Sequence, residues 1–281
     1  MINKGIILAG GFGTRMSPLT KAVNKQLLPI YDKPLVYYPL SVLMLAGIKN
    51  ILIIVNKGQT KEFKKVLSNG ERFGVKLSYK EQSYPRGLPE AFILGEKFIG
   101  KDNVALILGD NFFYGQNLTK NLIKCRKLKN GAEVFLHPVS NPSLYGVAKI
   151  NKSNKIQKII EKPKKTFSNL AITGLYFFDN NSIKFSKSLK PSKRKELEIV
   201  DLLNKYKNKN KLKANFLGGY LATKKKVIES LEKFSLEKTM MIVTHRNPIL
   251  SMVDRVFVIE NGKIITDQTP QQLGIKKASS K

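Results

Sequence analysis

Short apolar runs alternate with segments of helical period along the first half of the chain. Residues 5–9 form an uninterrupted apolar run, which predicts a strand buried on both faces. Residues 34–47 carry apolar side chains three and four positions apart and end at a glycine, which predicts a helix. The same criteria predict strands at 51–55, 75–80 and 104–108, and helices at 59–67, 89–98 and 117–128.

Strand patterns dominate the middle of the chain. We expect strands at 132–139, 146–150, 156–160 and 171–178, followed by helices at 182–189 and 197–206. Alternation of strands and helices at this spacing predicts an α/β fold with a doubly wound, mostly parallel sheet. There is no internal repeat.

The pattern of apolar and polar residues changes near residue 222, where we place a domain boundary. The predicted units are 1–222 and 223–281, the second being a small appended αβ fragment. Its expected elements are a helix at 224–234, a strand at 240–244, a helical turn at 248–252, and strands at 256–260 and 263–266. Asn261-Gly262 between the last two predicts a tight hairpin turn.

Composition narrows the class of protein. The chain has 281 residues with 42% apolar positions, which suits a globular domain with a sizeable core. Cys125 is the single cysteine, so no disulfide forms within the chain, and a reducing compartment fits. The longest apolar stretch, 35–46, contains Pro39 and is too short to cross a bilayer. We therefore predict a soluble, cytoplasmic protein without membrane insertion.

Charge is the unusual property. Fifty Lys and Arg against twenty Asp and Glu give a net charge of +30, which would suit a nucleic-acid-binding protein. The lysines are scattered along the whole chain, however, often beside asparagine, and do not cluster with arginine on one element. This distribution argues against a nucleic-acid partner. A basic surface would still attract phosphorylated substrates.

A glycine-rich loop follows the first predicted strand and reads Gly10-Gly11-Phe12-Gly13-Thr14-Arg15. Glycines let the backbone approach a phosphate closely and turn its N–H groups toward the anion, while arginine supplies a fixed cation. The spacing matches neither a dinucleotide-binding fingerprint nor a Walker A loop. A glycine loop alone could also be only a tight turn.

Asp110 follows Gly109 at the predicted carboxyl end of a strand, where open α/β sheets bind ligands. A carboxylate there, with phosphates nearby, suits Mg²⁺. The alternative is that Asp110 caps the segment that follows it.

Nine separated motifs, in order between residues 3 and 218, resemble glucose-1-phosphate thymidylyltransferases of the sugar nucleotidyltransferase family. Besides the segments 5–15 and 25–34, the motifs are Tyr37-Tyr38-Pro39-Leu40, Glu81-Gln82, Leu108-Gly109-Asp110-Asn111, Tyr145-Gly146-Val147, Glu161-Lys162-Pro163, Thr173-Gly174-Leu175-Tyr176 and Glu196-Leu197-Glu198-Ile199. The resemblance implies a Rossmann-like nucleotidyltransferase fold. It also implies Mg²⁺ as cofactor and dTTP and glucose 1-phosphate as substrates, which become dTDP-glucose and pyrophosphate.

The resemblance also implies residue roles. Arg15, Lys25 and Lys162 would be catalytic, neutralising charge around the reacting phosphates, and Asp110 would bind the metal. Nucleotide contacts would come from Leu8, Gly10, Gly11, Gly13, Thr14, Gln26, Gln82 and Gly87. Sugar-phosphate contacts would come from Tyr145, Gly146, Glu161 and Tyr176.

The resemblance fails after residue 218. Family members continue with a Trp-Leu-Asp-Thr-Gly-Thr motif, whose aspartate is a second metal ligand, and with helices used for subunit contacts. Here the chain reads Phe216-Leu217-Gly218-Gly219-Tyr220-Leu221-Ala222-Thr223 and contains no tryptophan. We therefore expect a lowered rate, and the sequence leaves the oligomeric state open because the family's interface region is absent.

The C-terminal segment instead resembles the end of an ABC transporter ATPase domain, through Met241-Ile242-Val243-Thr244-His245-Arg246 and the run from Asp254 to Ile264. That family's P-loop, Walker B acid and signature motif are absent, so His245 would have no nucleotide to sense and is better interpreted as a core histidine. The sequence thus suggests a fusion. Four hypotheses remain: an active thymidylyltransferase, a nucleotide-binding remnant without turnover, an ABC ATPase fragment, and a nucleic-acid binder.

Overall fold

The computed structural model describes residues 1–11, 13, 23–30, 33–115, 117–217, 219–222, 256–260, 263–269 and 271–272. The chain divides into two compact units, Met1–Thr223 and Lys224–Lys281. Unit 1 carries the large sheet and its helices. Unit 2 is described only at its last two strands.

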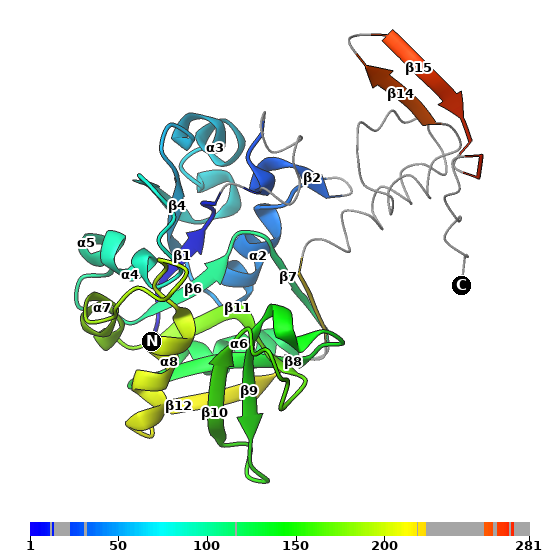
Figure 1. The fold of residues 1–281 in the computed structure, drawn as a ribbon. Coiled ribbons are helices and arrows are strands. Elements are labelled where there is room, and N and C mark those ends of the chain that lie inside the picture. The colour runs from blue at the N-terminus through cyan, green and yellow to red at the C-terminus, as the bar shows by residue number, and fades with distance from the viewer. Residues whose placement is uncertain are drawn as a thin grey trace. The chain divides into compact units, whose positions relative to one another are not determined.

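Four parallel strands form one half of the large sheet (Figure 1). They are β1 (Lys4–Leu8), β4 (Asn50–Asn56), β5 (Lys76–Gln82) and β6 (Val104–Leu108). Their order across the sheet is β6-β1-β4-β5, so β1 lies between β6 and β4. Their carboxyl ends therefore meet at one edge of the sheet.

Antiparallel pairing dominates the other half. Strand β11 (Leu170–Phe178) pairs antiparallel with β6, β8 (Ala132–Pro138) and β9 (Gly146–Ile150). Strand β10 (Ile156–Glu161) forms an antiparallel pair with β9, and β12 (Leu212–Phe216) runs parallel to β8. The β9–β10 pair projects from the body of the unit in Figure 1.

Helices cover both faces of the sheet, and each face has its own hydrophobic core. One core holds residues of α2 (Tyr37–Leu45), α3 (Thr60–Leu67) and α6 (Leu118–Arg126). The other core holds residues of α4 (Glu90–Leu94), α5 (Glu96–Ile99), α7 (Asn181–Lys187) and α8 (Ile199–Asn208). Neighbouring residues of β1 belong to different cores: Ile7 to the first and Ile6 to the second. This explains why the strand is a continuous apolar run.

The predicted α/β fold class is confirmed, and every strand predicted in unit 1 is present. The helix expected at 89–98 is divided at Gly95, which ends α4 and precedes α5. Helix α2 starts three residues later than predicted, at Tyr37. Four short strands were not predicted, because segments this short give no periodicity to detect: β2 (Pro29–Ile30), β3 (Lys33–Pro34), β7 (Asn111–Tyr114) and β13 (Gly219–Ala222). β12, with its alternating polar residues, was also missed.

In unit 2, β14 (Val256–Glu260) and β15 (Lys263–Gln268) form the antiparallel hairpin predicted from sequence. The helix expected at 224–234, the strand at 240–244, the turn at 248–252 and His245 lie outside the described residues.

Cys125 lies on α6 and is fully buried in the first core. Its thiol donates to Glu133 Oε2 at 3.1 Å, and Asn215 Nδ2 donates to the same carboxylate oxygen at 2.9 Å. Burial first, and then the charge of Glu133, raises the pKa of Cys125 well above its usual range. Within the described ranges, no helix has the length and apolar content to cross a membrane.

Candidate active site

The direction of the chain reverses at β1. From β1 the chain moves outward through β4 to β5, and it then returns to place β6 on the other side of β1. Loops that leave β1 and β6 therefore diverge, and a crevice opens at the carboxyl ends of these two strands, where α/β sheets bind ligands. Leu8 and Leu108, the last residues of the two strands, are paired in the sheet.

A pocket of about 250 Å³ occupies this crevice. It is lined by Leu8, Gly10, Gln26, Gln82, Pro85, Gly87, Leu88, Leu108, Asp110 and Glu196. Six of these were predicted as site residues: Leu8, Gly10, Gln26, Gln82, Gly87 and Asp110. Residues spread over a hundred positions of sequence thus meet in one cavity.

The glycine loop lies directly against Gln82. A Cβ atom on Gly10 would come within 1.9 Å of Gln82 Nε2, so only glycine fits there without moving that side chain. Gly11 and Gly13 have positive φ angles of 111° and 58°, which also favour glycine. The backbone of the loop is thus held against a side chain of the pocket. Thr14 and Arg15 lie outside the described residues.

Lys25 and Gln26 belong to a single turn of 3-10 helix, η2 (Lys25–Leu27). Asn24 caps this turn by accepting a hydrogen bond from the Gln26 backbone N–H at 2.8 Å. Lys25 Nζ lies 2.6 Å from Asp110 Oδ2. Gln26 Oε1 is buried and has no hydrogen-bond partner among the described residues. A buried acceptor without a donor lowers the stability of a protein by roughly 1–3 kcal/mol. Gln26 Oε1 could therefore accept a hydrogen bond from a hydroxyl or N–H group of a ligand.

Asp110 precedes strand β7, so the alternative that it caps a helix is wrong. Its two carboxylate oxygens contact Lys25 Nζ and, at 3.1 Å, Asn111 Nδ2. The described residues contain no cluster of three or more potential metal ligands. Strand β13 pairs with β7 and places Ala222 beside Asn111, and the sequence continues as Thr223-Lys224-Lys225-Lys226 without a carboxylate. Among the described residues, Asp110 and Glu196 are the carboxylates that line the pocket.

A second group of predicted residues lies where β9 and β10 meet. Glu161, the last residue of β10, pairs with Gly146, the first residue of β9. The Lys162 backbone N–H donates to Tyr145 O at 2.9 Å, and Lys162 has a positive φ of 42°. Residues other than glycine seldom adopt this backbone conformation. Those that do are found disproportionately often at functional sites. Tyr176 is 3% exposed, and burial first, then the charge of Glu161, raises its pKa.

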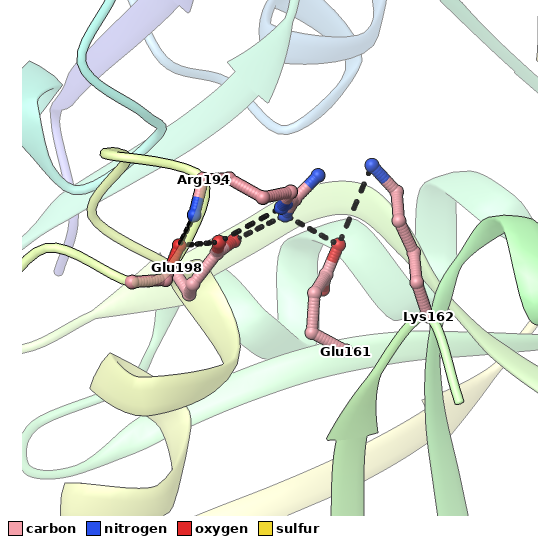
Figure 2. Close-up of polar contacts among 5 residues, drawn as sticks. Glu161, Lys162, Arg194 and Glu198 are labelled. Atoms are coloured by element: carbon pink, nitrogen blue, oxygen red, sulfur yellow. Dashed lines mark hydrogen bonds and ion pairs between the residues drawn. The ribbon is translucent and has the colours of Figure 1, made fainter. Parts of the chain in front are cut away.

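Arg194 and Glu198 complete this second group (Figure 2). Arg194 donates to both oxygens of Glu198, from Nε at 3.1 Å and from Nη2 at 2.6 Å, and its Nη2 lies 3.3 Å from Glu161 Oε1. Lys162 Nζ approaches the same Glu161 oxygen at 3.9 Å. Two cations and two carboxylates thus form one network.

Burial and the charge of Glu198 raise the pKa of Glu161, while Lys162 and Arg194 oppose this shift. Burial alone would lower the pKa of Arg194, but its hydrogen bond to Glu198 and the charges of three glutamates raise it overall. The guanidinium therefore keeps its charge.

The segment before α8 connects the two groups. Glu196 lines the pocket, and Glu198 holds Arg194. Between them, the Leu197 N–H donates to Arg86 O at 2.7 Å. A Cβ on Gly87 would lie 2.1 Å from Leu197 O, so the Gly87 loop and this segment touch through their backbones. The pocket and the charged network are therefore parts of one site.

The family model described as Nucleotidyl transferase matches residues 4–220, which is most of the chain. The chain belongs to the nucleotidyl transferase family. A glucose-1-phosphate thymidylyltransferase from Neisseria meningitidis serogroup A is 52% identical over 215 residues, covering 76% of this chain and 75% of the relative. One from Xanthomonas campestris pv. campestris (strain B100) is 49% identical over 218 residues, covering 77% and 74%.

Solved structures share the nucleotidyl transferase fold. A Bacillus anthracis protein assigned as a glucose-1-phosphate thymidylyltransferase, solved with a sucrose, gives a TM-score of 0.75 at 36% identity over 85% of this chain and 97% of that one. A UDP-glucose pyrophosphorylase solved with UDP-glucose gives 0.73 at 26% identity over 85% and 100%. None of these matches supports the resemblance of the C-terminal segment to an ABC ATPase, since the family match ends at residue 220.

Sequence reasoning assigned no role to three residues that structure this nucleotidyl transferase site: Asn56, Arg194 and Glu198. Glu198 belongs to a motif that carried the resemblance. Arg194 stands four positions before it in a non-helical segment that precedes α8, so no helical spacing signals this ion pair. Asn56 ends strand β4. Its only sequence signal is a polar residue at the carboxyl end of a strand of the parallel sheet.

Proposed function

We propose that this chain joins glucose 1-phosphate to dTTP to give dTDP-glucose and pyrophosphate. One observation carries the proposal: a pocket lined by glycines and amides lies next to a network of charged side chains. The two are joined by a backbone contact at Gly87. The first suits a nucleotide and the second a sugar phosphate. Relatives about half identical to this chain carry the name of this activity.

The amide-lined pocket would take the nucleotide. The loop of Gly10, Gly11 and Gly13 suits close approach of phosphate oxygens to its backbone, while the Gly11 N–H itself donates to Asn56 Oδ1. Gln26 Oε1, which has no partner among the described residues, can accept a hydrogen bond from the 3′-hydroxyl of the deoxyribose, and the buried amide of Gln82 can hydrogen-bond to the edge of a base. Leu8 and Gly87 would supply apolar walls and close backbone approach.

The charged network would take the sugar phosphate. Glu161 accepts hydrogen bonds from sugar hydroxyls, while Lys162 and Arg194 attract the phosphate. Gly146 suits close approach, since a Cβ there would lie 3.1 Å from Glu161 Oε2. Tyr145 lies beside this network, because its carbonyl accepts a hydrogen bond from the Lys162 backbone N–H. Tyr176 lies near enough to Glu161 for that charge to raise the pKa of its hydroxyl.

In the reaction, a phosphate oxygen of glucose 1-phosphate attacks the α-phosphorus of dTTP, and the bond to the β-phosphate oxygen breaks. The attacking phosphate is already ionised, so no general base is required. The protein's task is to bring two mutually repelling anions together in line and to stabilise the added negative charge. Lys25, Lys162 and Arg15 are the cations proposed for this role.

Asp110 would hold Mg²⁺. The Asp110 carboxylate at the pocket wall fits this ion, which is often bound by one or two carboxylates together with substrate phosphates. When bound, the ion would neutralise phosphate charge and polarise the reacting phosphoryl group. Lys25 Nζ, now 2.6 Å from Asp110, would then be available to the phosphates.

The test is pyrophosphate release by the purified chain with Mg²⁺, glucose 1-phosphate and each nucleoside triphosphate in turn. We expect release with dTTP that depends on the metal and falls by about a hundredfold or more in Asp110→Asn, since charge stabilisation is a large part of such rates. Absence of release with every nucleotide, from folded protein, contradicts the proposal.

A second candidate is a nucleotide-binding protein without turnover. It is favoured by the sequence directly after Ala222, Thr223-Lys224-Lys225-Lys226, which contains no carboxylate. This alternative predicts that dTTP raises the melting temperature while no product forms. We further propose that the activity belongs to residues 1–222, that 223–281 are an appended fragment, and that the protein works in the cytoplasm, where its free thiol stays reduced.

A further inference from the structure

Asn56 makes an unusual set of contacts at the end of strand β4. Its Oδ1 accepts a hydrogen bond from the Gly11 N–H at 2.9 Å, and its Nδ2 donates to Gly11 O, also at 2.9 Å. One side-chain amide thus binds both backbone groups of a single glycine. This fixes the direction in which Gly11 and its neighbours point.

The same oxygen has a second donor. Gln82 Nε2 donates to Asn56 Oδ1 at 3.1 Å, and Asn56 and Gln82 are paired across β4 and β5. Gln82 also lies against Gly10, as the 1.9 Å approach of a Cβ there indicates. The glycine loop and the Gln82 amide are therefore oriented by one shared acceptor.

We propose that Asn56 is a positioning residue that couples the phosphate-binding loop to the base-reading amide of Gln82. This proposal rests on the proposed function for the identity of the nucleotide. Asn56 does not line the pocket and acts through Gly11 and Gln82. Without it, the loop loses its fixed peptide orientation, and Gln82 loses the acceptor that sets which way its amide faces. Phosphate binding and base discrimination should therefore weaken together.

The test compares Asn56→Ala with Asn103→Ala. Asn103 is a matched control at the opposite edge of the sheet: its Nδ2 also bridges to backbone, at Leu128 O (2.9 Å) and Lys129 O (3.0 Å), far from the pocket. For Asn56→Ala we expect about a tenfold rise in the KM for dTTP, less than threefold change in the KM for glucose 1-phosphate, and a smaller preference for dTTP over UTP, because small misplacements at a site have large effects. Asn103→Ala should change none of these.

The double variant Asn56→Ala/Gln82→Ala separates coupling from a general loss of structure. Its preference for dTTP over UTP should be no lower than that of Gln82→Ala alone, since Asn56 acts on the base through Gln82. Additive losses, or unchanged kinetics beside a lowered melting temperature, overturn the proposal. If Asn56→Ala fails to fold, Asn56→Asp keeps the acceptor for the Gly11 N–H and for Gln82 Nε2 but loses the donor to Gly11 O, so the KM for dTTP should rise while the preference for dTTP over UTP is kept. An unchanged KM for dTTP in Asn56→Asp would overturn the proposal.

Failure of the proposed function can be distinguished from failure of the coupling by Asn56. If the wild-type chain shows no turnover, the shift in melting temperature with dTTP alone still tests the coupling, and Asn56→Ala should lose most of that shift while Asn103→Ala keeps it. A wild-type chain that is not shifted by any nucleotide overturns the coupling as well.

Discussion

The two halves of the site solve different recognition problems with different chemistry. The amide half, formed by Gly10, Gly11, Gln26, Asn56 and Gln82, relies on backbone and neutral side chains at the ends of parallel strands. The charged half, formed by Glu161, Lys162, Arg194 and Glu198, sits on antiparallel strands and the segment before α8. Neutral amides recognise a ligand by the direction of their hydrogen bonds, whereas the charged side chains add electrostatic attraction for an anion. The variants below test where the two halves depend on each other and where they can be disturbed separately.

The largest effect is expected at Lys25, which pairs with Asp110 at the wall of the pocket. Lys25→Met should lower kcat by about a hundredfold to a thousandfold, because it removes a cation from the reacting phosphates. Lys4→Met is the matched control, since Lys4 also pairs with an aspartate, Asp102, at 2.8 Å but far from the site. Steady-state kinetics check this prediction, and equal kinetics in the two variants would refute it.

Gly87→Ala tests the joint between the halves. The new Cβ would meet Leu197 O, and the φ of 103° is unfavourable for alanine, so we expect about 2–4 kcal/mol of lost stability and impaired binding of both substrates. Gly58→Ala shares a positive φ, 83°, but has no atom within 4 Å, so it should cost only about 1 kcal/mol. Urea unfolding measures both; equal losses would mean that backbone strain alone matters.

Arg194→Met should disturb the charged half alone. We expect the KM for glucose 1-phosphate to rise about tenfold, since hydrogen bonds to charged groups contribute roughly 1.5–3 kcal/mol, while the KM for dTTP stays within about twofold. Lys187→Met, which breaks the exposed pair with Glu96, is the control and should change neither. A rise in the KM for dTTP would show that the halves are not separable.

The smallest effect concerns pH. Because the folded-state pKa of Glu161 is raised by burial and by Glu198, the folded protein binds this proton more tightly than the unfolded chain. The resulting stability is present below the unfolded pKa of about 4.3 and is lost as pH rises through the folded pKa. The wild type should therefore lose stability relative to Glu161→Gln as the pH rises above about 4.3, as measured by urea unfolding at each pH. A difference independent of pH would contradict this.

Sequence reasoning located the pocket because its parts follow buried strands. The apolar runs ending at Leu8 and Leu108 show both faces of the sheet covered, and the glycines and Asp110 come directly after them. The network around Arg194 and the two hydrogen bonds from Asn56 to the backbone of Gly11 could not be predicted in this way. Both depend on side chains from distant segments meeting in space, and neither leaves a periodic pattern. Short strands such as β7 and β13 were missed for the same reason, because their pairing partner decides their conformation.

The single cysteine offers a way to time the opening of the domain. Cys125 is enclosed by the core that packs against the same sheet, and its thiol has a raised pKa and a hydrogen bond to Glu133. An alkylating reagent added to the native protein should therefore react only when that core comes apart, because the reagent needs both access and a thiolate. Since the chain has no other thiol, the rate of labelling reports this event alone, and its slowing by a bound nucleotide would measure how firmly the ligand keeps the domain closed.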